Sequence, residues 1–531
     1  MQVNDNVTPV NVRTICPVCS VGCSLEVVVQ NGQIANIQGI GGLINPEGEY
    51  CALPLAAVKE LKKLPRIIQP LLRDNGGFKP IAWQDAFALI TDEIKTCDPS
   101  DMAFFAGARI GNEEQYLIQK LARAGARTNN INTFHYLGRE LAYAGLSKAN
   151  LPFPEMELTT HVYLIGADVT ITHPVLADFI FKQQLDHGCR VTAISAEGDI
   201  SGSFQQKTIR VTSIYNFIKA VNHYILTEHL EDHLFLEPLI GNFEEYRKHL
   251  LSNSFESLVQ LAGVGAEVVS AFATSYLGDK SAVLLFAENN SGASTCSELF
   301  NLACISGKHG KTGSGLMLLK EKNNAHGLYD MGVMPSFSPG TDNWHDPLVR
   351  QRFQQAWQSG ELPDGEGISL EKLERGYYKK LFIFGEDPVG CAFEPERFSE
   401  PIGNADFTVV QDYFLTPTAA LAHLILPASW PWENGGTYTN TQKVLQNSDK
   451  IQSLTPGMAP EMASWQQLNQ LLNRLNAGNF EVLDEVLFEA AGLFPLFCSS
   501  SRLHLRLTAE ENFTPIFKAG CDAVSALSVK V

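Results

Sequence analysis

Four cysteines near the start of the chain constrain the fold most. Cys16, Cys19, Cys23 and Cys51 follow the spacing C-x2-C-x3-C-x27-C. Three thiols within eight residues must surround one small object, and a [4Fe–4S] cubane needs four thiolates. Structural zinc sites usually combine two well-separated C-x2-4-C pairs, which this spacing fits poorly. We therefore predict that these four cysteines bind a [4Fe–4S] cluster, with structural zinc or unligated core thiols as the alternatives.

Two residues inside this loop suit a cluster. Gly22 lets the backbone approach inorganic sulfide closely, and Pro17 stiffens the chain.

Length and charge limit the possible partners. The 531 residues are 45% apolar and 18% charged, which is ordinary globular composition and enough for three or four domains. The net charge of −18 disfavours binding to nucleic acid and to anionic membranes. Taken over the whole surface, this charge favours a basic or mixed-charge protein partner.

The remaining cysteines and the first residues indicate in which cellular compartment the protein is expected. Seven cysteines stand singly, and we expect them to be buried thiols of a protein in a reducing compartment: Cys97, Cys189, Cys296, Cys304, Cys391, Cys498 and Cys521. The first residues, Met1 to Val7, lack the basic and apolar regions of a signal peptide, and no apolar run is long enough to span a bilayer. We expect a cytoplasmic protein without direct membrane insertion.

The first eighty residues read as short elements around the cysteines. Residues 24–30 alternate between apolar and polar side chains, and the turn Gln30-Asn31-Gly32-Gln33 predicts a hairpin with residues 34–37. A short helix is expected over 54–63. Residues 66–82 are expected to be irregular, with a turn at 74–77.

Helical and strand patterns alternate from Trp83 onward, which is typical of a doubly wound α/β fold with a parallel sheet. Helices are expected over 83–97, 112–126 (with Asn112 as N-cap), 174–187, 215–228, 264–277 and 296–306. Strands are expected at 102–106, 162–166, 190–195, 208–211, 282–286, 380–384, 407–411 and 422–426. Residues 335–379 show little periodicity and are expected to form long loops.

Two glycine-rich stretches invite a nucleotide-binding interpretation. The stretch 307–315 lacks the GxxxxGK[ST] spacing and follows a helix, so we interpret it as a turn. The stretch 385–388 follows a buried strand, and ligands in α/β sheets bind beyond the carboxyl ends of strands. We expect 385–388 to line a cofactor cleft, either functional or vestigial.

Several motifs, in order, resemble the molybdopterin oxidoreductase superfamily, which includes formate dehydrogenases, nitrate reductases and the large iron–sulfur subunit of complex I. The matching segments are Asn45-Pro46-Glu47-Gly48-Glu49-Tyr50-Cys51 after the first three cysteines, Gly111 to Lys120, Ile165 to Asp168 with His173 to Leu176, Asn323 to Gly332, and Glu433 to Thr441 with Gln446. Together they cover roughly residues 12–450 in the family's order.

The resemblance implies a fold and its division into domains. It implies an α/β fold with a small N-terminal [4Fe–4S] domain followed by two interleaved doubly wound domains, and with the family's C-terminal β domain truncated. The expected boundaries are 1–60 for the cluster domain, 61–140 with 330–475 for one α/β domain, 141–329 for the inserted domain, and 476–531 for a short tail.

The chain departs from the family's pattern where the metal would bind. The resemblance puts Phe134 at the position of the molybdenum ligand, and a phenyl ring cannot bind a metal. Tyr136 and Arg139 stand where the family has its catalytic Arg and His, and His135 is interpreted as a structural histidine that does not point into the site.

Other pterin contacts of the family are also missing. The lysine that bridges cluster and pterin is absent from Cys51-Ala52-Leu53-Pro54. The family's DPR motif is replaced by Ser195-Ala196-Glu197, and its guanine-binding carboxylate loop by Thr212-Ser213-Ile214-Tyr215. We therefore expect no molybdopterin guanine dinucleotide.

These observations favour a non-catalytic iron–sulfur subunit that transfers electrons within a multi-subunit, NADH- or ferredoxin-linked oxidoreductase. The spacing of 27 residues between Cys23 and Cys51 resembles that of the complex I large subunit. Other flavin or iron–sulfur subunits would be its partners. Two alternatives stay open: a catalytic molybdenum or tungsten enzyme with altered metal ligation, and a redox-inert scaffold.

Overall fold

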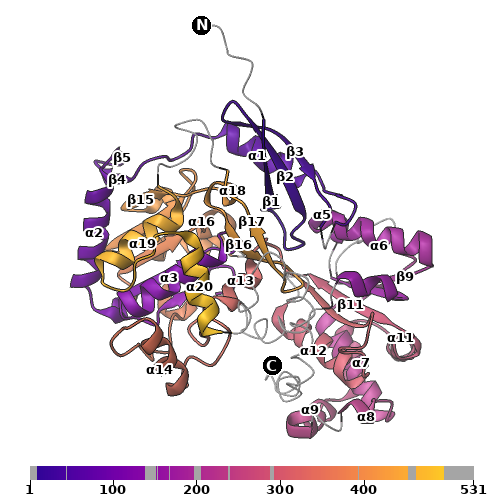
Figure 1. The fold of residues 1–531 in the computed structure, drawn as a ribbon. Coiled ribbons are helices and arrows are strands. Elements are labelled where there is room, and N and C mark those ends of the chain that lie inside the picture. The colour runs from indigo at the N-terminus through magenta and orange to yellow at the C-terminus, as the bar shows by residue number, and fades with distance from the viewer. Residues whose placement is uncertain are drawn as a thin grey trace.

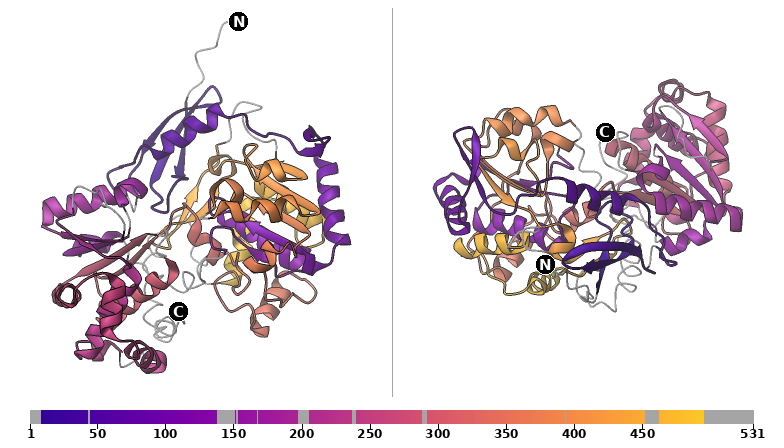
Figure 2. Two further views of the ribbon diagram at one scale, coloured as in Figure 1. Left: turned by 180° about the vertical axis from the view of Figure 1, so that it is seen from behind. Right: turned by 90° about the horizontal axis from the view of Figure 1, so that it is seen from above.

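The computed structural model describes residues 9–42, 45–137, 151, 153–166, 168–196, 205–236, 240–287, 292–392, 394–451 and 462–494. Arg139, Glu197, Cys498 and Cys521, which the sequence analysis singled out, lie outside these ranges. Figure 1 shows two α/β lobes side by side, with the indigo N-terminal sheet above them. Seen from above, this sheet lies between the two lobes (Figure 2, right).

The N-terminal part is an antiparallel sheet of β1 (Val10–Ile15), β2 (Ser24–Gln30) and β3 (Gln33–Gly39), in that order. Asn31 and Gly32 join β2 to β3 with φ angles of 52° and 71°, which confirms the predicted hairpin. Helix α1 (Leu53–Lys63) follows Cys51 and buries Val58 in the hydrophobic cluster that contains the cysteines.

The left lobe of Figure 1 contains a seven-stranded sheet built from two distant parts of the chain. Five adjacent strands, from one edge of the sheet inward, are parallel, and the hairpin β4–β5 forms an antiparallel opposite edge. In sheet order the strands are β5 (Gly77–Pro80), β4 (Leu71–Asp74), β15 (Leu424–Pro427), β14 (Phe407–Asp412), β13 (Lys380–Phe384), β6 (Met102–Ala106) and β7 (Ile131–Asn132). All five residues of β6 are buried, as expected for a strand that is covered on both faces.

The right lobe contains a five-stranded, fully parallel sheet. Its order is β10 (Lys207–Arg210), β9 (Arg190–Ser195), β8 (His161–Ile165), β11 (Ala282–Ala287) and β12 (Gly315–Leu319). The predicted doubly wound α/β class is thereby confirmed. The stretch 307–315 connects α12 to β12, which agrees with its interpretation as a turn.

The other elements complete the two lobes. The long helices are α2 (Trp83–Thr96), α3 (Asn112–Lys120), α6 (Pro174–His187), α7 (Ile214–Thr227), α9 (Ile240–Leu251), α10 (Phe255–Ala262), α11 (Ala266–Gly278), α12 (Gly292–Ile305), α14 (Pro347–Ala356), α19 (Ser464–Arg474) and α20 (Leu483–Leu493). The short ones are α5 (Val169–Thr172), α8 (His233–Leu236), α13 (Ala325–Asp330), α15 (Leu370–Glu374), α16 (Pro388–Cys391), α17 (Ser399–Gly403) and α18 (Pro431–Asn434), and a last hairpin joins β16 (Gly436–Thr439) to β17 (Leu445–Ser448).

Two expectations about secondary structure were wrong. Residues 66–82 form the β4–β5 hairpin, because β4 pairs with β15 at the edge of the sheet. The segment 335–379 contains α14 and α15, whose start signals are Asp346 and Ser369: each side chain accepts a hydrogen bond from a backbone N–H of the first turn.

The N-cap of α3 was also misassigned. Gly111 is the N-cap, and the Glu114 carboxylate accepts a hydrogen bond from its N–H at 3.0 Å. The Asn112 side chain instead donates to the hydroxyls of Thr437 and Thr439, at 3.2 and 3.1 Å.

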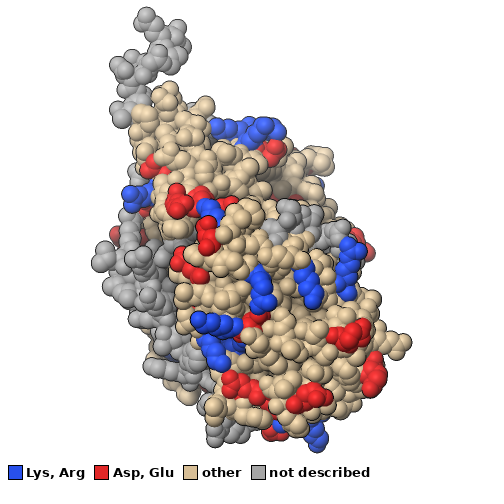
Figure 3. Space-filling model, turned by 90° about the vertical axis from the view of Figure 1, so that its right-hand side faces the viewer, with Lys and Arg blue, Asp and Glu red and all other residues tan. Residues whose placement is uncertain are grey.

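Within the described residues, no single helix is long and apolar enough to cross a membrane, although α10 and α11, bent by 93°, pass that test as a pair. Figure 3 shows the face at the right-hand side of Figure 1. Basic and acidic side chains are interspersed over this face and do not form a field of one sign.

Candidate functional site

The three N-terminal cysteines lie on one closed loop between β1 and β2. The N–H of Cys16 donates to the carbonyl oxygen of Cys23 at 2.9 Å, so the strand pairing of β1 with β2 closes the loop behind them. Gly22 has φ +70° and lets the chain turn back toward Cys23. Cys16, Cys19 and Cys23 are all buried.

Cys51 is brought to this loop by Asn45. The Asn45 amide oxygen accepts the N–H of Ser24 at 3.0 Å, and its NH2 group donates to the carbonyls of Ser24 and Glu49 at 3.0 and 2.9 Å. Asn45, the first residue of the segment that resembles the family's motif, thus fixes the chain leading to Cys51 beside Cys23.

The electrostatics of the cysteines suit a metal cluster. Burial and, to a smaller extent, the charge of a Cys51 thiolate raise the pKa of Cys19 to about 11. Burial and the neighbouring cysteines likewise raise the pKa of Cys16 and Cys23. The charge of Cys51 acts on each of the other three thiols, so the four lie close together, and as free thiolates they would repel one another. Iron would compensate that negative charge.

The same cysteines do not form a site for a single ion. In the part of the chain that the structure describes, no three His, Cys, Asp or Glu side chains converge tightly enough to hold one metal ion. A cubane holds its thiolates further apart than a single tetrahedral ion does, because one iron lies between each thiolate and the core. The choice of a cubane over structural zinc stays a prediction from the cysteine spacing.

The cluster loop is held from behind by the β16–β17 hairpin. The N–H of Thr441 donates to the carbonyl oxygen of Ser20 at 2.6 Å, and the Gln446 amide donates to that of Gly22 at 2.8 Å. A Cβ atom on Gly22 would lie 2.1 Å from the Gln446 side-chain oxygen. The segment 433–446 therefore stabilises the cluster loop through its backbone and the Gln446 side chain.

Two cations lie between the cluster loop and the interior, where the sequence analysis expected none. Arg109 donates to the carbonyl oxygens of Pro17 and Val18, and its charge lowers the pKa of Cys16 and Cys19. Lys320 exchanges backbone hydrogen bonds with the Ser20 hydroxyl at 2.6 and 3.0 Å. Its ammonium group lies 5.1 Å from the centre of the Tyr136 ring. The sequence could not reveal them, because both come from strand ends far from Cys51.

Next to Arg109 is a pocket of about 170 Å³ at the carboxyl ends of strands from both sheets. The loops after β6, β7 and β13, which are neighbours in the seven-stranded sheet, provide one side. The loop after β12 of the five-stranded sheet provides Glu321 and Lys322. Gly385 to Pro388 line this pocket, and its use as a cofactor cleft stays a prediction.

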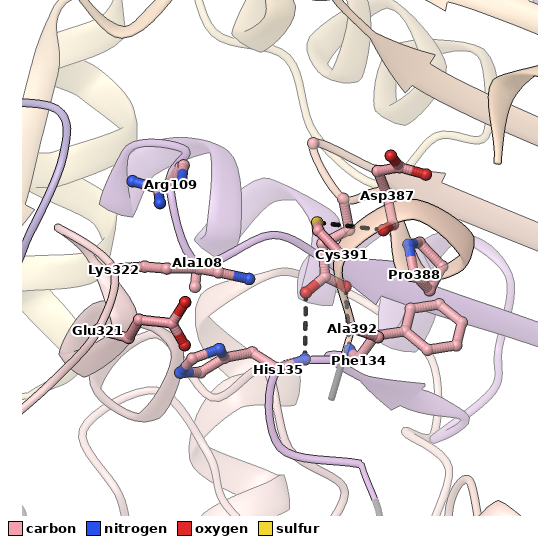
Figure 4. Close-up of a pocket in the computed structure, with 12 residues that line it drawn as sticks. Ala108, Arg109, Phe134, His135, Glu321, Lys322, Asp387, Pro388, Cys391 and Ala392 are labelled. Atoms are coloured by element: carbon pink, nitrogen blue, oxygen red, sulfur yellow. Dashed lines mark hydrogen bonds between the residues drawn. The ribbon is translucent and has the colours of Figure 1, made fainter. Parts of the chain in front are cut away.

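A buried carboxylate organises the wall of the pocket. Glu386 accepts hydrogen bonds from the Thr133 hydroxyl (2.8 Å) and from the N–H groups of Phe134 (3.0 Å) and His135 (3.3 Å). Burial raises its pKa to about 7, although the charge of Lys322 lowers it. Both carboxylate oxygens are therefore occupied with the 133–135 segment (Figure 4).

Phe134 and His135, predicted at and next to the metal position, differ in where their side chains lie. Phe134 packs its ring against Phe105 and Phe398, with ring centres 4.1 and 4.9 Å apart, in the core beside the pocket. The expectation that His135 points elsewhere was wrong, because its side chain lines the pocket and reaches toward Glu321 (Figure 4).

The single cysteines differ from one another. Cys189, Cys296 and Cys304 are buried, as predicted. Cys97 is only partly buried, and Cys391 is exposed and lines the pocket, where its thiol donates to the Asp387 carbonyl oxygen at 3.1 Å. The prediction that all were buried was therefore wrong for these two: Cys97 is the C-cap of α2, and Cys391 is the last residue of the short helix α16.

The segment 212–215, predicted to replace the family's guanine-binding loop, leads into α7. Ser213 is the N-cap of α7, and its hydroxyl accepts the N–H of Asn216 at 3.2 Å.

Comparison with known families decides the assignment. Residues 10–52 match the molybdopterin oxidoreductase Fe4S4 domain, and residues 66–479 match the molybdopterin oxidoreductase model. The chain belongs to the molybdopterin oxidoreductase family. The expectation of a [4Fe–4S] domain followed by the family's α/β fold is thereby confirmed.

Individual relatives of this family member are formate dehydrogenases. It is 27% identical to F420-dependent formate dehydrogenase 2 subunit alpha of Methanococcus maripaludis, over 95% of this chain and 78% of the relative. It is 27% identical to formate dehydrogenase H of Escherichia coli, over 87% of this chain and 68% of the relative. Acetylene hydratase from Pelobacter acetylenicus has a similar fold, with a TM-score of 0.65 at 16% identity, over 93% of this chain and 72% of that one.

Proposed function

We propose that this protein is an electron-transferring iron–sulfur subunit of a multi-subunit oxidoreductase, with one [4Fe–4S] cluster on Cys16, Cys19, Cys23 and Cys51 and without a working molybdopterin site. One contrast carries the proposal. Three of the thiols lie on one closed loop and Asn45 holds the segment of the fourth beside it, whereas Phe134, at the expected position of the metal ligand, packs its ring into the core.

The pocket supports this interpretation. Glu386 is the buried carboxylate nearest the 133–135 segment, and its two oxygens already accept three hydrogen bonds there. It is therefore poorly placed to serve as a substitute oxygen ligand. The remaining acidic groups of the wall, Glu321 and Asp387, lie on opposite sides of the pocket (Figure 4).

The two segments that match the family well, 323–332 and 433–441, have structural uses. Their presence is therefore no argument for catalysis. Glu433 forms a buried pair with Arg66, with nitrogen–oxygen distances of 2.5 and 2.9 Å. The Asn324 amide donates to the Ile110 carbonyl at 2.7 Å, and its oxygen accepts the N–H of Thr439 at 2.7 Å. The contacts of Asn324 join the segment after β12 to the loop after β6 and to β16.

The partners follow from the electron-transfer role. Relatives are named as alpha subunits of F420-dependent formate dehydrogenases, which implies other subunits in those enzymes. For this chain we infer flavin or iron–sulfur subunits as electron donor and acceptor, as in the complex I large subunit that its cysteine spacing resembles.

The test is EPR spectroscopy of the anaerobically purified, dithionite-reduced chain. We expect one rapidly relaxing S = 1/2 signal that integrates toward one spin per chain and is abolished by reoxidation with a viologen. A chain that binds iron but gives no signal at any accessible potential would favour the redox-inert scaffold. A chain without iron would refute both the electron-transferring subunit and the redox-inert scaffold.

A catalytic molybdenum or tungsten enzyme remains the second candidate because of one observation. The exposed thiol of Cys391 lines the pocket opposite His135, so this wall offers a possible thiolate ligand from a different element. Stoichiometric pterin in an acid extract, lost together with formate:viologen activity in Cys391→Ser, would establish this candidate and refute the first.

A further inference from the structure

The right lobe has a second pocket, at the opposite edge of its sheet from Glu321 and Lys322. This pocket of about 240 Å³ lies between α11 and the first residues of β8, β9 and β10. Figure 1 shows α11 and β9 at the outer side of the right lobe. All strands of this sheet are parallel, so their amino ends lie away from the loop that follows β12. The second pocket is therefore separate from the cluster loop and from the pocket around Glu386.

A buried carboxylate behind the wall of this pocket is bound by three side chains. Asp279 follows α11, and its side chain is 2% exposed. One of its oxygens accepts the Tyr163 hydroxyl at 2.7 Å and lies 2.9 Å from Nδ1 of His161. The other oxygen accepts a hydrogen bond from Nη2 of Arg190. Burial raises the pKa of Asp279, but the hydrogen bonds from His161 and Tyr163 and the nearby positive charges lower it by more. Asp279 is therefore an anion that is fixed in place.

This carboxylate positions a guanidinium group at the mouth of the pocket. The Arg190 side chain lines the pocket and is 55% exposed, although Asp279 holds its Nη2 group. Its other N–H groups have no hydrogen-bond partner among the described residues. A guanidinium held at one end presents the rest of its planar set of donors, which matches the shape of a carboxylate.

The charged groups around the pocket are mostly basic. Lys207, the first residue of β10, is exposed, lines the pocket and forms no ion pair with a described residue. None of the described residues that line the pocket is acidic. The Lys308 ammonium group donates to the backbone carbonyl of Asp279 at 2.6 Å. The described residues that line the pocket or bond to Asp279 therefore include three cations, Arg190, Lys207 and Lys308, against one carboxylate.

The inner walls of the pocket are apolar and aromatic. Tyr163, Ile209 and Phe272 line it and are 1, 6 and 3% exposed. The rings of Tyr163 and Phe272 meet edge to face, with their centres 5.1 Å apart. The volume is below the roughly 300–1,000 Å³ that is usual for drug-sized ligands, so the pocket suits a small molecule. Its apolar part would lie against these walls and its charged part at the basic mouth.

We propose that this pocket binds a small carboxylate with a ring-shaped apolar body. The carboxylate lies on the guanidinium of Arg190, and the ring packs against Ile209 and Phe272. Lys207 adds a second positive charge at the same mouth. This inference concerns the right lobe alone and does not depend on the proposed electron-transfer function.

The donors at the mouth favour a carboxylate over a phosphate. Phosphate sites usually gather several free backbone N–H groups. Here the backbone N–H of Val191, which lines the pocket, already donates to the Gln206 side-chain oxygen at 2.8 Å. The fixed guanidinium of Arg190 instead offers one planar pair of donors, which suits a monoanion.

The experiment uses the holo chain and benzoate as the probe. Isothermal titration calorimetry and saturation-transfer difference NMR measure the binding of benzoate, benzamide and phenylphosphonate at one ionic strength. Benzamide has the same ring without the charge, and phenylphosphonate has the same ring with a phosphate-like group. We expect saturable binding of one benzoate per chain, with at least about tenfold weaker binding of the other two compounds.

Two variants alter the pocket in different ways. Arg190→Gln removes the guanidinium, and Ala271→Leu fills the pocket from the exposed side of α11 without changing any charge. Arg375→Gln is the matched control, because Arg375 is also an exposed arginine that pairs with a carboxylate, that of Glu371. We expect the affinity for benzoate to fall about tenfold or more in both pocket variants and to stay at the wild-type value in the control. Thermal unfolding checks that each variant is folded, and if Arg190→Gln is not, Ala271→Leu decides.

Three results would overturn the proposal: no saturable binding of benzoate to the wild type, binding that is unchanged in either folded pocket variant, or benzamide or phenylphosphonate that binds as tightly as benzoate. None of these results bears on the EPR signal of the cluster. The carboxylate site and the electron-transfer function therefore fail independently.

Discussion

Arg109 donates a hydrogen bond to the carbonyl oxygen of Val18 at 2.5 Å, which places its guanidinium against the cluster loop while the residue also lines the pocket. It comes from the loop after β6, in the seven-stranded lobe. One side chain therefore joins the cysteine loop to the carboxyl edge of the sheet. A cation here stabilises negative charge on the cluster side.

Replacing this arginine should make the cluster harder to reduce. In Arg109→Ala the positive charge beside Cys16 and Cys19 is lost, so the added electron is less stabilised and the reduction potential should fall. Arg109→Lys, which keeps the charge, should recover most of the difference. Potentiometric titration followed by EPR measures this, with Arg127→Ala as control, because Arg127 also donates to a backbone carbonyl but far from the cysteines. An unchanged or higher potential in Arg109→Ala would contradict the assignment.

The buried pair of Arg66 and Glu433 should be important for stability. Their side chains are 8 and 7% exposed, so Arg66→Ala leaves a buried carboxylate without its partner and should cost about 3–5 kcal/mol of unfolding free energy. Arg66→Met/Glu433→Gln removes both charges, keeps an acceptor for the Trp430 N–H, and should cost clearly less. Urea unfolding of Arg66→Met, Glu433→Gln and the double variant gives the coupling energy. A loss in the double variant equal to the sum of the two single losses would show that the pair is not coupled.

Gly22→Ala should damage the cluster loop for two separable reasons. The positive φ costs a non-glycine residue about 1–2 kcal/mol, and the new methyl group would collide with the Gln446 side chain. Gly188→Ala is the matched control, because Gly188 has φ +66° but no atoms near the position of a Cβ. We expect iron content to fall only in Gly22→Ala and to recover in part in Gly22→Ala/Gln446→Ala. Full iron occupancy in Gly22→Ala would argue against the described packing.

Glu114 should make stability fall as the pH rises. Burial raises its pKa to about 8 from the usual 4.5, so between these values the folded chain holds a proton that the unfolded chain releases. Its stabilising contribution is therefore complete below about pH 4.5 and is lost as the pH rises through about 8. Glu114→Gln still accepts hydrogen bonds from Gly111 and Asn434 but cannot titrate, so its thermal stability should vary less over this range. The exposed Glu244→Gln serves as control, and a pH profile unchanged by Glu114→Gln would contradict the shifted pKa.

Much of the fold could be predicted from the sequence, because buried strands of parallel sheets are short apolar runs with recognisable limits. Strands 102–106, 190–195 and 380–384 lie where they were expected. The α14 helix was missed, because its apolar signal is limited to Leu348, Val349 and Phe353 in a polar segment.

The site was less predictable than the fold. The cysteine spacing identified the cluster loop, but the contacts of Arg109 and Lys320 depend on how the strand ends of two lobes meet, which no local pattern records. His135 was misplaced for the same reason: its orientation is determined by the backbone hydrogen bonds that Glu386, more than two hundred residues later, accepts from the 133–135 segment.

The central claim is that this family member keeps its cluster and lacks a working pterin site. Anaerobic analysis of the purified chain for iron, molybdenum, tungsten, zinc and pterin tests it most directly. We predict about four irons per chain, as one cubane requires, and no stoichiometric molybdenum, tungsten or pterin. Molybdenum or tungsten near one per chain, together with pterin, would contradict the account and make this protein an enzyme in its own right.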